Sequence, residues 1–305
     1  MSYESKLAEF NEAIEGGAKV ETQDWMPDDY RRGVLKFIEM HANSEIMGAL
    51  PERECLPKAP SLKRKMSLAA KIQDEVGHAQ LLYRVAEDLG KSREAMYSDL
   101  VHGRSKFHNV FHYPVSHWGD VAIIGWLIDG AALVTQAALL ESSYAPYTRV
   151  LKRICSEEQL HLRHGEDITM ELASGTDTQR ALFQDALDRW WLPIIHFFGP
   201  RSNVAKDLLL RWKVKTRTNE DLRQEFLDRY VPKVLELGYS FPTPVPHRDG
   251  DHWRVRDEDI DWSPLDAIKR NEGPETARRL GLRRRIYEDH RWVREAMSEP
   301  SLYAA

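Results

Sequence analysis

Two short stretches of the sequence each combine a glutamate with a histidine three residues later. KIQDEVGH (71–78) contains Glu75 and His78, and RICSEEQLH (153–161) contains Glu158 and His161. On a helix, residues at this spacing project from the same face, so the two side chains of a pair could bind one metal centre together. A single pair is weak evidence, because the composition alone gives roughly two such pairs by chance.

Both pairs lie on the apolar face of a predicted helix, and another acid interrupts such a face well upstream of each. Glu45 precedes Glu75 by thirty residues, and Asp129 precedes Glu158 by twenty-nine. A carboxylate that faces the core is costly unless a partner compensates its charge. Apolar residues recur at helical offsets around both Glu-x-x-His pairs. They are Leu68, Ile72, Ala79 and Leu82 around the first pair, and Leu151, Ile154, Leu162 and Ile168 around the second.

The chain therefore repeats one pattern, in which a helix with an inward carboxylate precedes a helix with an inward Glu-x-x-His. A four-helix bundle needs this set of side chains to hold two metal ions. Four carboxylates balance the charge of two divalent ions, and an oxygen-rich set with two imidazoles suits iron or manganese better than zinc or copper. The predicted ligands are Glu45, Glu75, His78, Asp129, Glu158 and His161.

Three other acids are set aside on their positions in the sequence. Glu141 lies only seventeen residues before the second pair, which breaks the spacing of the first half and favours Asp129. Glu52 and Glu54 follow Pro51. Because proline disrupts a helix interior, the first helix is expected to end before it and both acids to lie beyond that helix.

Four further residues have roles that the sequence can only suggest. Asp74 and Glu157 precede the two ligand glutamates, and acids in such positions commonly orient a histidine of the neighbouring helix. We interpret Tyr83 as a packed aromatic residue with a hydrogen-bonded hydroxyl, in preference to a radical site. His41, one turn before Glu45, is interpreted as a hydrogen-bonded interior histidine, with an approach to the site as the alternative.

The composition limits the class of protein. The 305 residues are 42% hydrophobic and 30% charged, and the net charge of −5 argues against a general nucleic-acid-binding protein. The two cysteines, Cys55 and Cys155, are too few for an iron–sulfur cluster and form no CxxC pair. The polar N-terminus predicts a cytoplasmic protein. No membrane span is expected, because the longest apolar run (121–134) is short and contains Asp129.

Helix starts and stops predict an all-α protein, and the ligand pattern predicts that its core is a four-helix bundle, with additional C-terminal helices and an extended C-terminal tail. Residues 1–238 are expected to form the metal-binding bundle with its flanking helices, and 239–305 a C-terminal extension within one structural domain. The predicted bundle helices are 27–50, 61–89 with Ser61 as N-cap, 117–142 with Ser116 as N-cap, and 146–175. Further helices are predicted at 92–101, 178–198, 203–215, 219–237 and 276–297, with a loop at 103–116 and an irregular tail at 241–262.

Several strings resemble the oxygenase subunits of phenylacetyl-CoA epoxidases, a ferritin-like di-iron family. The similar segments are QDWMPDDYRR (23–32), HANSEIMGALPE (41–52), AKIQDEVGHAQ (70–80), WLIDGAAL (126–133), KRICSEEQLHLRHG (152–165), RWWLPIIHFFGP (189–200), RWKVKTRTNEDLRQEF (211–226) and WVREA (292–296). The resemblance thus covers nearly the whole chain. It implies a di-iron centre held by the six ligands predicted above.

The resemblance also implies a reaction and partners. The family forms an epoxide on the aromatic ring of phenylacetyl-CoA with O2 and electrons from NADPH. Its members work with a ferritin-like scaffold subunit that lacks the metal ligands, small accessory subunits, and a flavin/iron–sulfur reductase. The sequence independently requires an electron donor, because the chain has neither a dinucleotide-binding fingerprint nor enough cysteines for a cluster.

Coenzyme A carries phosphates that need cationic partners. The resemblance implies that the thioester is held by residues at the positions of Lys36, Lys106, Asn109, Lys213 and Lys215, and Arg217 extends the same basic stripe. Lys106 and Lys213 are the preferred pair, and ordinary solvated lysines are the alternative. The aromatic run 190–198 could line an acyl pocket, although core packing is the more common use of such residues.

Three other interpretations stay open at this point. A ribonucleotide-reductase-type radical subunit shares the ligand plan, but Leu82 stands where its tyrosine would be expected. A non-catalytic ferritin-like storage or scaffold protein is disfavoured by the intact ligands and the long C-terminal third. An epoxidase of benzoyl-CoA is a close chemical neighbour, but its oxygenase component is a considerably longer chain.

Overall fold

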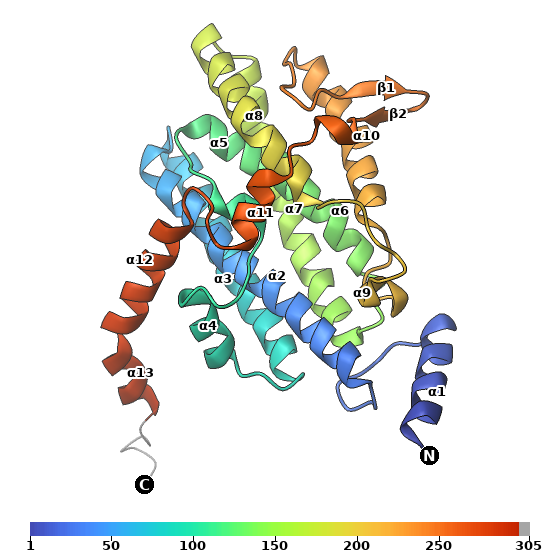
Figure 1. Cartoon of the computed structure of the whole chain (residues 1–305). Helices are drawn as coiled ribbons and strands as arrows, with labels where there is room; N and C mark the ends of the chain where they lie inside the picture. The colour runs from blue at the N-terminus through green and yellow to red at the C-terminus, as the bar shows by residue number, and fades with distance from the viewer. Residues whose placement is uncertain (299–305) are drawn as a thin grey trace.

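A bundle of long helices forms the centre of the molecule in the computed structural model, which describes residues 1–298 (Figure 1). The first pair comprises α2 (Asp28–Cys55) and α3 (Leu62–Glu87), which pack along each other. The second pair comprises α7 (Ala145–Ala173) and the helical stretch formed by α5 (Trp118–Ile123), η3 (Ile124–Ile128) and α6 (Asp129–Leu139). Contacts between α3 and α7 join the pairs, and the predicted all-α bundle is confirmed.

The bundle helices begin where side chains can satisfy the first backbone N–H groups. Ser61 caps α3 as predicted, since its hydroxyl accepts a hydrogen bond from the Arg64 N–H. The prediction of Ser116 as a cap is wrong, because His117 occupies that position at the start of α5. The Asp120 carboxylate accepts from the backbone N–H groups of Ser116 and His117, and it completes a capping box in which His117 is the N-cap.

The first bundle helix does not end before Pro51, so that prediction is also wrong. Pro51 lies inside α2, which continues to Cys55. An interior proline removes a backbone hydrogen bond and costs about 3 kcal/mol. Burial of Leu50, Pro51 and Cys55 and an ion pair of Glu52 offset this cost. Glu52 is consequently a buried residue of the bundle and does not lie beyond the helix.

The third bundle helix contains a π-helical turn at η3, directly before Asp129. Gly125 in this turn packs against Gly165 of α7 so closely that a Cβ on Gly165 would overlap the Gly125 backbone. Segments of π-helix occur often at functional sites. Here the two glycines bring the helix that carries Asp129 close to the helix that carries Glu158.

We expect Gly165→Ala to lower the free energy of unfolding by about 1–3 kcal/mol, because two backbones must separate to admit the methyl group. Chemical denaturation measures this change. Gly77→Ala is the matched control: nothing lies within 4 Å of its Cβ position on α3. That change should stabilise the protein by up to about 1 kcal/mol. Equal effects of the two substitutions would contradict the close-packing account.

Other helices surround the bundle. The short helix predicted at 92–101 is confirmed as α4 (Arg93–Val101), and those predicted at 178–198 and 219–237 are confirmed as α8 (Asp177–Phe197) and α10 (Asn219–Glu236). The helix predicted at 203–215 is wrong, since only α9 (Leu208–Arg211) is helical there. An additional helix that was not predicted, α1 (Tyr3–Glu15), lies near the N-terminus. Trp190 and Trp191 are core residues, 2% and 1% exposed.

The C-terminal part adds a small ribbon and three helices. β1 (His247–Asp249) pairs antiparallel with β2 (His252–Arg254) within the predicted irregular tail. α11 (Ser263–Lys269) follows, and the single helix predicted at 276–297 is instead α12 (Thr276–Asp289) and α13 (Arg291–Ser298), which extend along one edge of the molecule (Figure 1). Short 3-10 turns lie at Leu56–Lys58, Asn109–His112 and Asp257–Asp259. The Thr276 hydroxyl contacts His112 Nδ1 at 2.6 Å and ties this part to the predicted loop.

One helical stretch, Trp118–Leu139, has the length and apolar composition of a membrane span, with a mean hydropathy of 1.6. Its most apolar window is 72% buried inside the bundle. The stretch is therefore accounted for as a core helix, in keeping with the expectation for this segment.

Candidate metal centre

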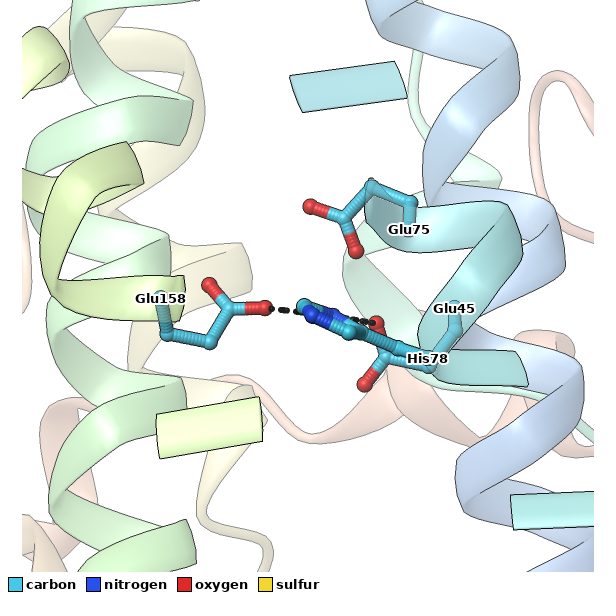
Figure 2. Close-up of side chains that lie close together, drawn as sticks. All are labelled: Glu45, Glu75, His78 and Glu158. Carbon is cyan, nitrogen blue, oxygen red and sulfur yellow. Dashed lines mark ion pairs between the residues drawn. The ribbon is translucent and has the colours of Figure 1, made fainter. Parts of the chain in front are cut away.

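The six predicted ligands converge at the centre of the bundle, although they come from four separate helical segments. Glu45 lies on α2, Glu75 and His78 on α3, Asp129 at the start of α6, and Glu158 and His161 on α7. Ligand atoms of Glu45, Glu75, His78 and Glu158 lie within 4.8 Å of one another (Figure 2), as do those of Asp129, Glu158 and His161. All six residues are buried. These groups could hold metal ions.

Glu158 belongs to both groups and lies between the two histidines. One of its carboxylate oxygens is 3.2 Å from His78 Nδ1, and the other is 3.2 Å from His161 Nδ1. Glu75 Oε1 is 3.5 Å from His161 Nδ1, and Glu45 Oε2 is 3.8 Å from His78 Nδ1. The Nδ1 atoms of both imidazoles therefore face the carboxylates at the centre of the cluster.

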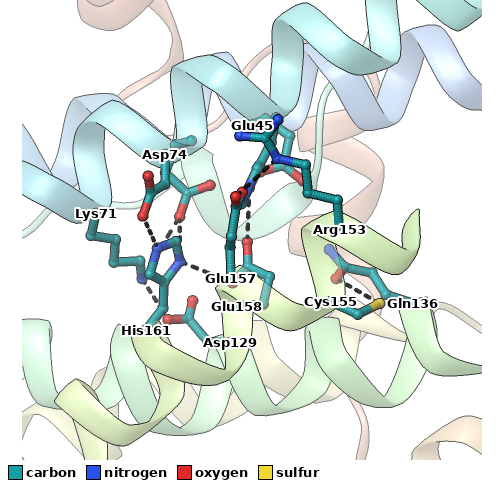
Figure 3. Close-up of polar contacts among 12 residues, drawn as sticks. Glu45, Lys71, Asp74, Asp129, Gln136, Arg153, Cys155, Glu157, Glu158 and His161 are labelled. Atoms are coloured by element: carbon teal, nitrogen blue, oxygen red, sulfur yellow. Dashed lines mark hydrogen bonds and ion pairs between the residues drawn. The ribbon is translucent and has the colours of Figure 1, made fainter. Parts of the chain in front are cut away.

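Each of the two histidines is held at its outer nitrogen by a carboxylate of the other helix, as Figure 3 shows for His161 and Asp74. His78 Nε2 on α3 is 2.9 Å from the Glu157 carboxylate on α7, and His161 Nε2 on α7 is 3.1 Å from the Asp74 carboxylate on α3. Arg153 donates to the other oxygen of Glu157 at 2.9 Å. The structure thus places Asp74 and Glu157 against histidines of the neighbouring helix, and each fixes the direction in which its imidazole presents Nδ1.

We expect Asp74→Asn to weaken metal binding by about 10- to 100-fold, because a carboxylate partner both orients a histidine and makes it more basic. Anaerobic titration with Fe²⁺ measures the affinity. Asp88→Asn, at the C-terminal end of the same helix, is the control. An unchanged affinity in Asp74→Asn would show that the contact with His161 is not used in binding.

A lysine that was not among the predicted site residues lies inside the cluster. Lys71 Nζ is 2.6 Å from Glu52 Oε1, 2.5 Å from Asp129 Oδ2 and 3.9 Å from Glu75 Oε1. Lys71 is only 4% exposed. One pattern could have identified it: Lys71 lies four residues before Glu75 on the same inward face. Glu52 was missed because Pro51 was expected to end the helix.

The protonation of the cluster shows how it compensates its negative charge. Burial raises the pKa of Glu75 well above its usual range, and the nearby Glu158 and Glu45 carboxylates add to the effect. Burial opposes protonation of His78, but the adjacent Glu158 and Glu45 carboxylates outweigh this effect and raise its pKa to about 10. For Glu158, burial would raise the pKa, but interactions with His161 and His78 outweigh burial and lower the pKa to about 2. Protons and the Lys71 ammonium therefore supply positive charge at a site built from carboxylates.

The donor set fits a pair of metal ions on its own chemistry. His78 Nδ1 is buried 3.2 Å from a Glu158 oxygen and makes no well-aligned hydrogen bond with the residues that the structure describes, so on loss of its proton it would present a lone pair to the centre. Carboxylate oxygens outnumber imidazole nitrogens two to one among the six residues, a set that suits iron or manganese. Divalent ions can replace the positive charge that protons otherwise provide.

A cavity of about 290 Å³ reaches this cluster. Its wall includes Glu45, Glu75, Asp129 and Glu158 together with apolar residues, among them Phe37, Phe111, Ile124, Ile128, Leu139 and Phe198. Lys215, Thr216 and Arg217 also line it, and the same three residues line a second cavity of about 760 Å³. The two cavities therefore share a basic boundary.

The structure brings only part of the predicted substrate-binding set to these cavities. Lys215 lines both cavities, whereas Lys213 lines the larger one and donates to the Glu15 carbonyl. Lys36 and Lys106 are exposed and are not among the residues lining either cavity. Asn109 is buried and donates to the Pro193 carbonyl at 2.8 Å.

Two interpretations of residues near the site can be compared with the structure. Tyr83 is 4% exposed and its hydroxyl donates to Asn43 Oδ1, so it is the packed, hydrogen-bonded aromatic residue expected. His41 is hydrogen-bonded to Tyr147 and also contacts Glu45. Both descriptions considered for His41, an interior hydrogen-bonded residue and a neighbour of the site, therefore hold.

Comparison with known proteins agrees with this geometry. The family model described as "Phenylacetic acid catabolic protein" matches residues 5–292. The chain is 43% identical over 289 residues to one of the subunits of the 1,2-phenylacetyl-CoA epoxidase of Escherichia coli (strain K12), and the match covers 94% of each protein. The chain therefore belongs to the phenylacetic acid catabolic protein family.

Proposed function

We propose that this chain is the catalytic oxygenase component of a multicomponent di-iron monooxygenase that epoxidises the aromatic ring of phenylacetyl-CoA. The observation that carries the proposal is the intact, buried set of four carboxylates and two histidines, whose four carboxylates line a mainly apolar cavity. The name of the E. coli relative supports the substrate and the reaction. A scaffold protein would have no need for these buried carboxylates. Their burial costs stability unless a cation compensates their charge.

Two iron ions held by Glu45, Glu75, His78, Asp129, Glu158 and His161 would supply the activation of O2. The protein's own residues do the rest. The paired contacts of Asp74 and Glu157 hold the two imidazoles in fixed orientations. The apolar wall of the cavity can pack against an aromatic ring and exclude water from it.

The electron balance requires a partner. Epoxidation adds one oxygen atom to the ring and reduces the other to water, so the arene supplies two electrons and two more, with two protons, must come from a donor. The only cysteines, Cys55 and Cys155, are both buried and are too few for a cluster. We propose that an NADPH-dependent flavin/iron–sulfur reductase, small accessory subunits and a ferritin-like scaffold subunit complete a cytoplasmic complex. The E. coli relative supports this, because its name describes one subunit of a larger enzyme.

Lys215 and Arg217 are the cations best placed for the phosphates of coenzyme A, because they lie where the two cavities meet. Lys215 Nζ is now 2.7 Å from Asp207. We expect Lys215→Ala to raise KM for the acyl-CoA by about 10-fold with little change in kcat, which corresponds to the loss of one charge-assisted hydrogen bond. Lys152→Ala, an exposed lysine of α7, is the control. A lower kcat with unchanged KM would contradict this role.

Turnover by the reconstituted complex tests the proposed function. Phenylacetyl-CoA should yield an epoxide product with consumption of O2 and NADPH in equal amounts, and benzoyl-CoA should be the poorer substrate. The matched control is the same mixture with a chain that carries Glu158→Ala. No product from phenylacetyl-CoA in an iron-loaded complex would overturn the substrate assignment.

A further inference from the structure

One face of α2 forms a wall of the cavity that reaches the metal centre. Phe37, His41, Glu45, Gly48 and Glu52 line the cavity and recur every three or four residues, so they share that face. Gly48 follows the predicted ligand Glu45 by about one turn, and among these five residues it alone has no side chain. The space beside it on the cavity wall must therefore be filled from another segment.

The ring of Phe111, from the 3-10 turn Asn109–His112, fills the space beside Gly48. Its Cζ and Cε1 atoms lie 3.0 Å and 3.1 Å from the point that a Cβ on Gly48 would occupy. Phe111 also lines the cavity. The ring and the α2 backbone are thus in contact at the cavity wall, and even a methyl group at position 48 would push the ring aside.

A displaced Phe111 ring can move only toward the cavity. Its backbone is fixed, because its N–H donates to the His108 carbonyl at 3.2 Å and its carbonyl accepts from Arg279 at 2.7 Å. Elsewhere the side chain packs against the buried apolar cluster of Met47, Leu50, Leu100 and Phe107. Protein interiors are closely packed with few voids, so the cavity is the open space that the ring would enter.

The basic boundary of the cavity lies far from Gly48 along α2. The Lys215 N–H donates to the Leu209 carbonyl at 3.0 Å, and Leu209 packs against Gly33 of α2, with its Cδ2 3.3 Å from the Cβ position of that glycine. Gly33 precedes Gly48 by fifteen residues. This separation corresponds to about 22 Å along a helix. A thioester whose phosphates bind near Lys215 would therefore extend along α2, with its acyl group toward Glu45 and Gly48.

We propose that Gly48 and Phe111 form the end wall of the acyl pocket and set the size of the acyl group that reaches the metal centre. This inference rests on the proposed function, because it takes an aromatic acyl-CoA as the ligand. The missing side chain of Gly48 lets the Phe111 ring lie back against the helix, which leaves the cavity in front of it free for the ring of the substrate.

Binding of two thioesters to the metal-free full chain tests this role. Gly48→Ala should weaken the binding of phenylacetyl-CoA by about 10- to 200-fold, the range for one methylene in an apolar pocket. Binding of acetyl-CoA, whose acyl group is too short to reach the end wall, should be unchanged. Isothermal titration calorimetry measures both affinities. Gly77→Ala, with nothing within 4 Å of its Cβ position, is the matched control and should change neither. Equal losses for both thioesters in Gly48→Ala would overturn the proposal.

A second substitution tests whether Gly48 acts through the Phe111 ring. Leucine at position 111 lacks the Cε1 and Cζ atoms that lie against Gly48. In a chain that already carries Phe111→Leu, the further change Gly48→Ala should therefore alter the affinity for phenylacetyl-CoA by at most about two-fold. The full loss in this background would contradict the proposal. An unmodified chain that does not bind phenylacetyl-CoA would instead contradict the proposed function.

Discussion

A chain that carries Glu75→Ala together with His161→Ala should lose both bound irons and all measurable turnover. The unmodified chain is expected to bind about two irons when loaded anaerobically with Fe²⁺, as its ligand set implies. Each substitution removes a ligand from a different group of the cluster, so neither ion would retain a complete set. Iron per chain, measured by colorimetric assay after desalting, and product formation in the reconstituted complex report the result.

The matched control for this experiment is Glu141→Ala. This acid was weighed as a ligand on spacing, and in the structure it is exposed, beyond the end of α6. Its removal should leave about two irons per chain. Iron binding that survives intact in the double variant would show that the metal, if any, is held elsewhere, and the assignment of the site would fail.

Removal of the buried lysine should have the largest effect on the metal-free protein. In Lys71→Met, the carboxylates of Glu52 and Asp129 lose the ammonium that now lies within 2.6 Å of both. Loss of one partner from a buried ion pair costs about 3–5 kcal/mol, because the remaining charge has no compensation. We expect a drop of that size in the free energy of unfolding, measured by chemical denaturation of metal-free protein.

Iron should reverse part of this loss. A divalent ion that binds only the folded state stabilises it in proportion to its affinity, and two uncompensated carboxylates beside the site favour its binding. The rise in Tm on addition of Fe²⁺ should therefore be larger for Lys71→Met than for the unmodified chain. Lys65→Met, at an exposed position of the same helix, controls for the loss of a charge. A metal-free Lys71→Met protein as stable as this control would contradict the ion-pair account.

The inward acids and histidines could be predicted because each stands out against an apolar helical stripe. Glu75 and His78 interrupt one stripe and Glu158 and His161 another, and the structure brings all four together with Glu45 and Asp129. Periodicity is a property of the local sequence, so it places side chains on a face without knowledge of the neighbours. The same reasoning predicted the positions of the bundle helices to within a few residues. It did not predict the π-helical turn in the third helix or the continuation of the first helix past Pro51.

What could not be predicted depends on contacts between distant segments. Pro51 remains helical because its helix is buried there. The expectation that proline ends a helix considers only the local backbone and not the burial of the segment. The spacing of Lys71 from Glu75 indicates an inward position, but its ion pairs with Glu52 and Asp129 depend on segments far away in the sequence. The π-helical turn at Ile124–Ile128 follows no residue pattern that we used; its glycine packs against a glycine forty residues later in the chain.

Because each histidine is oriented by a carboxylate from the other helix pair, the metal centre lies at the interface between the two halves of the bundle. The histidine of α3 is oriented only by α7, and the histidine of α7 only by α3, among the contacts described for their outer nitrogens. A fragment that contains α2 and α3 alone would carry three of the ligands, yet its histidine would lack the Glu157 carboxylate that orients it. Assembly of the bundle and completion of the site are thus a single event. A newly made chain would gain its capacity to bind metal only after its second half has docked.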